Sequence, residues 1–136
     1  MGWFSRKAPV VHDLNAVDVA RGMTEGSVLL VDVREPNEVA AEAYPDAFVL
    51  PMSVFDPMQI PDPHGRKVVF ACRSGKRSAA AALAAQEAGL SYDSHLEGGI
   101  LAWKAAGPVS QPPSALVLLA NPMVPIIFFI SSSFLS

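Results

Sequence analysis

The sequence has little cysteine and little concentrated positive charge. Cys72 is the only cysteine in 136 residues, which excludes an internal disulfide and any CxxC-type metal or dithiol site. Ten lysines and arginines against thirteen acidic residues give a net charge of −3. Phosphate backbones bind concentrated Lys and Arg, so we expect no nucleic-acid partner. The N-terminus also lacks a secretory h-region and a myristoylation serine, which predicts a cytoplasmic protein.

Apolar residues are plentiful, at 51% of the chain. That content supports a packed core, and the length suits one ordinary domain. The composition divides the chain into three segments. We expect a short N-terminal segment at 1–9, a compact domain at 10–107, and an apolar, proline-containing tail at 108–136.

The expected domain alternates two kinds of segment. Residues 28–31 and 67–71 are continuous apolar runs, as in strands buried on both faces. The helical segments have caps, glycine stops or high alanine content, and they are 15–25 (capped by Asp13 or Asn15), a helix starting at 35–38, 78–88 and 99–106. This alternation predicts an α/β fold, with a small, mostly parallel sheet and helices on both faces.

Cys72 stands at the end of an expected strand, directly before a helix, where sites form in such sheets. A thiol is nucleophilic only when ionised. Loop N–H groups, the helix N-terminus and the charges of Arg73, Lys76 and Arg77 all favour the anion. Gly75 permits the tight turn that such a loop needs. These features favour a reactive thiol over a buried filler cysteine.

Three motifs occur in order along the domain. They are Asp32-Val33-Arg34-Glu35, the loop Cys72-Arg73-Ser74-Gly75-Lys76-Arg77-Ser78, and His95-Leu96-Glu97-Gly98-Gly99 with Trp103 four residues later. Together they resemble the rhodanese domain, over about residues 10–107.

The resemblance implies a sulfurtransferase with Cys72 as the sulfur carrier. The residues implied to bind the donor or the transferred sulfur are Arg73, Ser74, Gly75, Lys76, Arg77 and Ser78. The donor would be thiosulfate or a persulfide, and the acceptor a thiol, cyanide or a protein thiol. No metal and no organic cofactor is implied.

Other residues are expected to support the structure. Asp32 and Arg34 are interpreted as a buried pair that braces the loops, with Glu38 as a candidate third member. His95, which precedes Leu96 in a third expected strand, and Trp103 are expected to pack in the core. Gly98-Gly99 is expected to form a tight turn with close backbone approach. The sequence departs from the family pattern at Glu42-Ala43-Tyr44, where Gly-His-Ile is usual.

Two other functions compete with sulfur transfer. A cysteine phosphatase or arsenate reductase needs a Cys-x5-Arg loop, but the spacing from Cys72 to Arg77 is Cys-x4-Arg. A non-catalytic binding or sensing module commonly loses the cysteine, and this sequence keeps it. Delivery of sulfur to a protein thiol and turnover of small molecules use the same persulfide, so the sequence does not separate them.

No charged residue follows Lys104, and residues 115–120 and 126–130 are strongly apolar. Their combined length is near that of a membrane span. The prolines between them and the missing basic flank weaken that interpretation. Membrane contact through residues 115–135, a surface-packed extension, an oligomerisation strand and a tail without a selected role all remain open.

Overall fold

The computed structural model describes residues 8–107. These residues form a five-stranded sheet in the order β1-β5-β4-β2-β3. The strands are β1 His12–Leu14, β2 Val28–Asp32, β3 Phe48–Val49, β4 Lys67–Ala71 and β5 Ser94–Leu96. Every strand pair described in this sheet is parallel. The predicted α/β fold is confirmed, and the sheet is more uniformly parallel than the sequence suggested.

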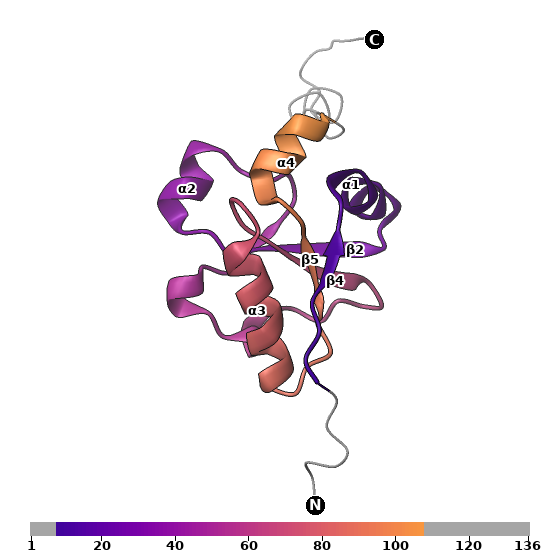
Figure 1. The fold of residues 1–136 in the computed structure, drawn as a ribbon, viewed down its shortest axis with the longest axis vertical. Coiled ribbons are helices and arrows are strands. Elements are labelled where there is room, and N and C mark those ends of the chain that lie inside the picture. Colours follow the sequence, from indigo (N-terminus) through magenta and orange to yellow (C-terminus); the bar gives the residue numbers. More distant parts are fainter. Residues whose placement is uncertain (1–7, 108–136) are drawn as a thin grey trace, which may run out of the picture. The chain divides into compact units, whose positions relative to one another are not determined.

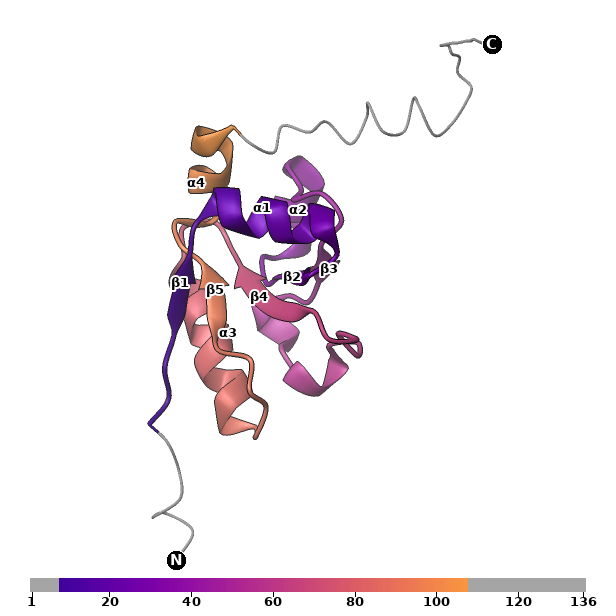
Figure 2. The same cartoon turned by 90° about the vertical axis from the view of Figure 1, so that its right-hand side faces the viewer.

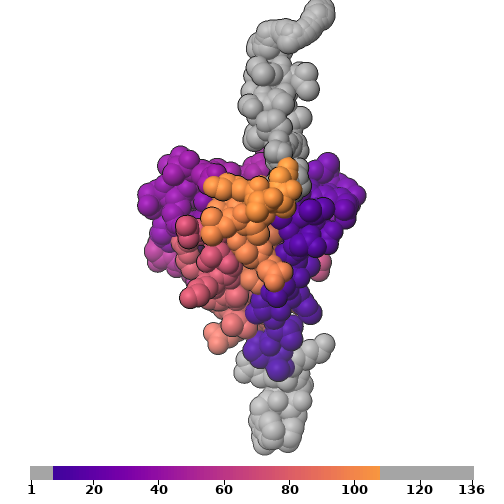
Figure 3. Space-filling model, turned by 45° about the horizontal axis from the view of Figure 1, so that its top comes forward, coloured from indigo at the N-terminus to yellow at the C-terminus, as the bar shows by residue number. Residues whose placement is uncertain are grey.

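Helices cover both faces of the sheet. They are α1 Ala16–Glu25, α2 Pro36–Ala41, α3 Lys76–Glu87 and α4 Gly99–Ala106, with short 3₁₀ helices η2 Met52–Val54 and η3 Pro57–Gln59. Helices α1 and α3 lie on opposite sides of the strands (Figures 1 and 2). Helix α4 packs beside α1, and the space-filling view shows it directly against the N-terminal part of the domain (Figure 3). The loop that begins at Cys72 follows β4 and leads into α3, and backbone hydrogen bonds join it to α4.

The helix boundaries follow local chemistry. The side chain of Asn15 accepts a hydrogen bond of 2.8 Å from the Asp18 N–H and caps α1, while Gly26 ends the helix with a φ of 78°. Asp13, the other candidate cap, lies in β1 instead. Helix α3 begins at Lys76, two residues earlier than predicted, because the turn at Gly75 is completed within one residue at a φ of 107°.

The two central strands are buried on both faces, as their apolar runs predicted. All residues from Leu29 to Asp32 in β2 and from Val68 to Ala71 in β4 are buried. Helix α3 faces this core with Ala81, Ala82 and Ala85, which are fully buried. Their small side chains bring the helix close to β4, and the loop between β4 and α3 is correspondingly tight.

Two strands were not predicted. β1 has three residues, two of them exposed, and β3 has two residues. Neither has the apolar run or the alternation that marks a strand in sequence. Each forms because a neighbouring strand, β5 or β2, offers a free edge.

The tail at 108–136, with its predicted membrane contact, lies outside the described residues. Within residues 8–107, no helix has the length and apolar character to cross a membrane.

Candidate functional site

The cysteine loop and the Asp32 bend begin at neighbouring strand ends. β2 and β4 pair in register, with Asp32 opposite Ala71, so Cys72 follows its strand beside the end of β2. The Val33 N–H donates to the Ala71 carbonyl over 2.9 Å and continues this pairing. The Cys72 side chain is buried, with 1% of the residue exposed. The two motifs, separated by 40 residues in sequence, therefore form one continuous site.

The sulfur of Cys72 lies at the focus of several donors. The Gly75 N–H donates to Sγ over 3.1 Å and the Ser78 N–H over 3.4 Å. The Ser78 hydroxyl oxygen lies 3.5 Å from Sγ. Burial by itself raises the pKa of the thiol, but the hydrogen bonds from Ser78, Gly75 and Ser74 outweigh it and leave the pKa below its ordinary value. This arrangement favours the thiolate, the reactive form.

The carbonyl groups of the loop are held on the other side, by α4. The Ile100 N–H donates to the Cys72 carbonyl over 2.9 Å, and the Leu101 N–H to the Arg73 carbonyl over 3.3 Å. The Tyr44 hydroxyl also donates to the Cys72 carbonyl, over 2.5 Å. N–H groups in the first turn of a helix have no partner within that helix. In α4, two of them donate to the carbonyl oxygens of the cysteine loop. With the carbonyls bound there, the loop's N–H groups are available to the sulfur.

Glycines make this approach feasible. Gly98 and Gly99 have φ values of 78° and 59°. A Cβ on Gly99 would lie 2.3 Å from the Arg73 carbonyl carbon and 2.6 Å from the Cys72 carbonyl oxygen. The prediction of a tight turn with close backbone approach is confirmed.

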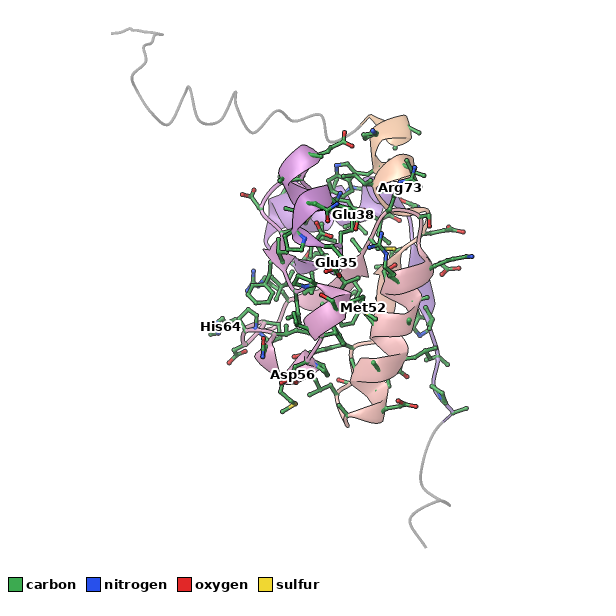
Figure 4. All side chains as sticks on the ribbon, turned by 90° about the vertical axis from the view of Figure 1, so that its left-hand side faces the viewer. Glu35, Glu38, Met52, Asp56, His64 and Arg73 are labelled. Carbon is green, nitrogen blue, oxygen red and sulfur yellow. The ribbon has the colours of Figure 1, made fainter. Side chains whose placement is uncertain are left out.

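The three cations of the loop do not behave alike. Arg77 makes two hydrogen bonds to the Glu38 carboxylate, at 2.7 and 2.9 Å. Because of Arg77, the pKa of Glu38 is lowered to about 2. Arg73 and Lys76 are exposed, and no acidic side chain among residues 8–107 pairs with either of them. Figure 4 shows Arg73, Glu38 and Glu35 on the face where the loop meets α2. Two of the three predicted cations thus remain available to an anionic ligand.

Asp32 and Arg34 form a buried ion pair, as the sequence interpretation expected. The guanidinium donates to Asp32 at 2.7 to 3.2 Å, and the Arg34 N–H adds a bond of 3.0 Å to Oδ1. Their side chains are 1% and 3% exposed. Burial lowers the pKa of Arg34, but the bonds to Asp32 raise it above its ordinary value. Glu38, the candidate third member, pairs with Arg77 instead.

Two residues of the site have contacts that the sequence analysis missed. Tyr44, noted only as a departure from the family pattern, is buried and also lies with its ring 5.0 Å from the Arg34 guanidinium carbon. His95 is buried as expected, but both ring nitrogens are bonded: Nδ1 lies 2.8 Å from the Ser78 hydroxyl and Nε2 2.7 Å from Asp13 Oδ1. In the sequence, the only signal of such contacts is the chemical type of these side chains, a phenol and an imidazole, which both form hydrogen bonds.

Trp103 packs in the core as predicted, edge-on to Tyr44 with ring centroids 5.3 Å apart. Among the side chains that the structure describes, no group of three His, Cys, Asp or Glu residues is arranged to hold a metal ion.

Comparison with known proteins assigns the region that contains this site to a family. The family model of the rhodanese-like domain matches residues 15–106. The "Sulfurtransferase" of Allochromatium vinosum is 35% identical over 76% of this chain and 98% of its own length. The uncharacterized protein slr1261 of Synechocystis is 46% identical over 61% of this chain, and the aligned region spans only 46% of slr1261.

Among solved structures, RPA3614 from Rhodopseudomonas palustris has a TM-score of 0.60 and 35% identity. It covers 71% of this chain and 82% of its own, and it is described as a protein of unknown function and a possible tyrosine phosphatase. The family match includes the Asp32 bend, the cysteine loop and the segment from His95 to Trp103. This chain therefore belongs to the rhodanese-like domain family, and the relatives it resembles include a named sulfurtransferase.

Proposed function

We propose that this protein is a sulfurtransferase that carries sulfane sulfur as a persulfide on Cys72. The observation that carries the proposal is the pair of backbone N–H groups, from Gly75 and Ser78, that donate to Sγ at the end of a buried strand. A thiolate and a persulfide are both anions, so the same donors stabilise the empty and the loaded forms.

The proposed reaction has two balanced steps. The Cys72 thiolate attacks the sulfane sulfur of thiosulfate, the S–S bond of the donor breaks, and sulfite leaves with the electron pair. A thiol or cyanide then attacks the outer sulfur of the persulfide, and Cys72 leaves as the thiolate. A persulfide donor would load the cysteine by the same displacement. Because the sequence has a single cysteine, the acceptor must be another molecule, including a thiol on another protein.

The charges around the loop support an anionic donor. The exposed cations Arg73 and Lys76 would attract thiosulfate, and the N–H groups from Ser74 to Ser78 would bind it close to the sulfur. Arg77 contributes less directly, because Glu38 already neutralises its charge. We assign the reaction to a reducing compartment, the cytoplasm, where acceptor thiols remain reduced.

Phosphoryl transfer is a weaker alternative. It would need an arginine to bind the oxyanion, and Arg77 is one residue too near in sequence and is bonded through two nitrogens to Glu38. A non-catalytic module would need no lowered thiol pKa. The site therefore supports sulfur transfer better than either alternative.

The test is the intact mass of the protein after brief thiosulfate treatment, followed by cyanide. We expect the wild type to gain one sulfur atom and lose it as thiocyanate, and Cys72→Ser to gain none. Circular dichroism would verify that the variant is folded. A folded wild type without the gain would contradict thiosulfate as donor, and hydrolysis of a phosphate ester that depends on Cys72 would favour the phosphatase.

A further inference from the structure

A chain of hydrogen bonds links the reactive sulfur to the surface. It runs from Cys72 Sγ to the Ser78 hydroxyl at 3.5 Å, from that hydroxyl to His95 Nδ1 at 2.8 Å, and from His95 Nε2 to Asp13 Oδ1 at 2.7 Å. The His95 side chain is 7% exposed, whereas Asp13 is 57% exposed. Asp13, the loop from Cys72 to Ser78, and His95 come from three separate parts of the sequence, so only the fold brings them together.

The carboxylate of Asp13 fixes the proton on the imidazole. A carboxylate only accepts hydrogen bonds, so His95 donates its Nε2–H to Asp13, and Nδ1 is left as an acceptor. The Ser78 hydroxyl then donates to Nδ1, although the Gly75 carbonyl, at 3.1 Å, is a second acceptor for it. A lone pair of the Ser78 oxygen is thereby directed to the Cys72 thiol.

From this geometry we infer that His95 is the proton acceptor for Cys72, acting through Ser78 and oriented by Asp13. The thiol proton passes to the Ser78 oxygen as the Ser78 proton passes to His95 Nδ1. The products are a thiolate and an imidazolium, and Ser78 is again a neutral hydroxyl. The two bonds on either side of the Ser78 oxygen have reversed, so Ser78 now donates to the thiolate and accepts from His95, while His95 Nε2 still donates to Asp13. His95 is a positioning residue, because it acts on the sulfur through Ser78.

Other charged groups near the chain do not offer this path. Arg77 and Tyr44 are electrostatically coupled to Cys72, but Arg77 is paired with Glu38, and the pKa of Tyr44 is raised, first by burial. The remaining ionisable residues of the adjoining loop and helix termini are exposed: Arg73, Lys76, Glu97 and Lys104. In the described domain, His95 is the imidazole bonded to the cysteine loop.

The biological role of this proton transfer rests on the proposed function. Its test does not, because ionisation of Cys72 can be measured without a sulfur donor. The first measurement is the ultraviolet absorbance of the thiolate against pH, taken as the difference from Cys72→Ser. We compare the wild type with His95→Ala and His95→Asn. The Asn amide can bond to Ser78 near the position of Nδ1, but it cannot take a proton. His64→Asn is the control, since His64 is exposed and its φ of 51° suits Asn.

We expect the thiolate midpoint to rise by about one pH unit in both His95 variants, leaving about tenfold less thiolate below the midpoint. The His64 variant should match the wild type. If His95→Asn restores the wild-type midpoint, His95 only packs and hydrogen-bonds, and the inference is overturned.

A second measurement covers the case in which the His95 variants do not fold. The imidazole of His95 is titrated by NMR in the wild type and in Cys72→Ser. We expect a lower His95 midpoint in Cys72→Ser, because a thiolate nearby stabilises the imidazolium and the two groups titrate together. Equal midpoints would overturn the inference. Failure of thiosulfate loading with the coupling intact would instead count against the proposed donor.

Discussion

Two loops leave neighbouring strand ends and use buried polar groups in opposite ways. In the Asp32 bend after β2, the carboxylate and the guanidinium of Arg34 satisfy each other, at 2.7 to 3.2 Å. In the cysteine loop after β4, the donors of Gly75 and Ser78 converge on a single sulfur. The first arrangement is complete in itself, while the second still has cations, Arg73 and Lys76, that face no acidic partner in residues 8–107.

The difference separates support from chemistry. A buried pair that is fully neutralised has no capacity left for a ligand, and its removal is felt in stability. A buried atom surrounded by donors is prepared for negative charge, and its removal is felt in reactivity. Perturbing each loop in turn should therefore give opposite balances of stability and sulfur loading.

The largest expected effect on stability comes from breaking the pair in the bend. Asp32→Asn keeps the shape of the side chain but leaves the buried Arg34 charge unpaired, and we expect a loss of about 3–5 kcal/mol in the free energy of unfolding. Asp18→Asn is the matched control, since its pair with Arg21 is exposed and should be worth less than about 1 kcal/mol. Urea unfolding measures both. Equal losses would mean that burial does not distinguish the pairs.

The next effect should come from the glycine that supports the cysteine loop. Gly99→Ala would place a Cβ against the carbonyls of Arg73 and Cys72. We expect a loss of about 2–4 kcal/mol from steric conflict and the left-handed backbone, together with loss of sulfur loading.

Gly65→Ala separates these two causes. Gly65 has a φ of 84° and nothing within 4 Å of an added Cβ, so it should lose about 1–2 kcal/mol from backbone strain alone and keep full loading. Unfolding and mass after thiosulfate are measured on both variants. Normal loading by Gly99→Ala would show that the contact with α4 does not shape the loop.

The ion pair between α2 and α3, the helices that follow the two loops, should have a smaller, pH-dependent effect. Arg77 lowers the pKa of Glu38 from 4.5 to about 2. A carboxyl with a lower pKa in the folded state stabilises the protein above the unfolded value, and this contribution is lost as the pH falls from 4.5 to about 2. Because Glu38 is 25% exposed, solvent screening reduces the contribution to about 1–2 kcal/mol.

Glu38→Gln tests this expectation by urea unfolding across the acid range. The variant should be less stable at neutral pH and should have a flatter pH dependence below the unfolded pKa. Glu42→Gln, whose pair with Lys104 is half exposed, should change stability by less than about 0.5 kcal/mol. A pH dependence identical to the wild type would assign the acid sensitivity to other carboxyls.

The sequence predicted the local structure of both loops better than the distant residues that contact the cysteine loop. Strand ends, the cysteine loop and the Asp32–Arg34 pair could be predicted because each depends on residues close together in sequence. The partners of the loop could not. Tyr44, His95 and Asp13 reach it only through the order of the strands, and β1, which carries Asp13, has no strand pattern of its own. Likewise, the sequence predicted Arg77 as a residue that binds the donor, but not its ion pair with Glu38 of α2.

The smallest expected effect comes from the residue that touches both loops. The Tyr44 ring lies against Arg34 and Trp103, while its hydroxyl bonds to the Cys72 carbonyl. Tyr44→Phe keeps the ring and removes only that bond. The Cys72 carbonyl still accepts from Ile100, so no buried acceptor is left without a partner, and we expect a loss of about 1 kcal/mol.

The thiolate midpoint of Cys72 in Tyr44→Phe shows whether the Tyr44 hydroxyl acts on the cysteine loop. If the hydroxyl serves the cysteine loop, Tyr44→Phe should also shift the thiolate midpoint of Cys72, by less than about one pH unit. Tyr92→Phe is the control, because the Tyr92 ring packs on Phe70 in the same core. In that variant, the thiolate midpoint of Cys72 should not move. A Tyr44 variant that is destabilised with an unchanged midpoint would assign Tyr44 to the bend alone. The bend and the cysteine loop would then be energetically independent although their strands are neighbours.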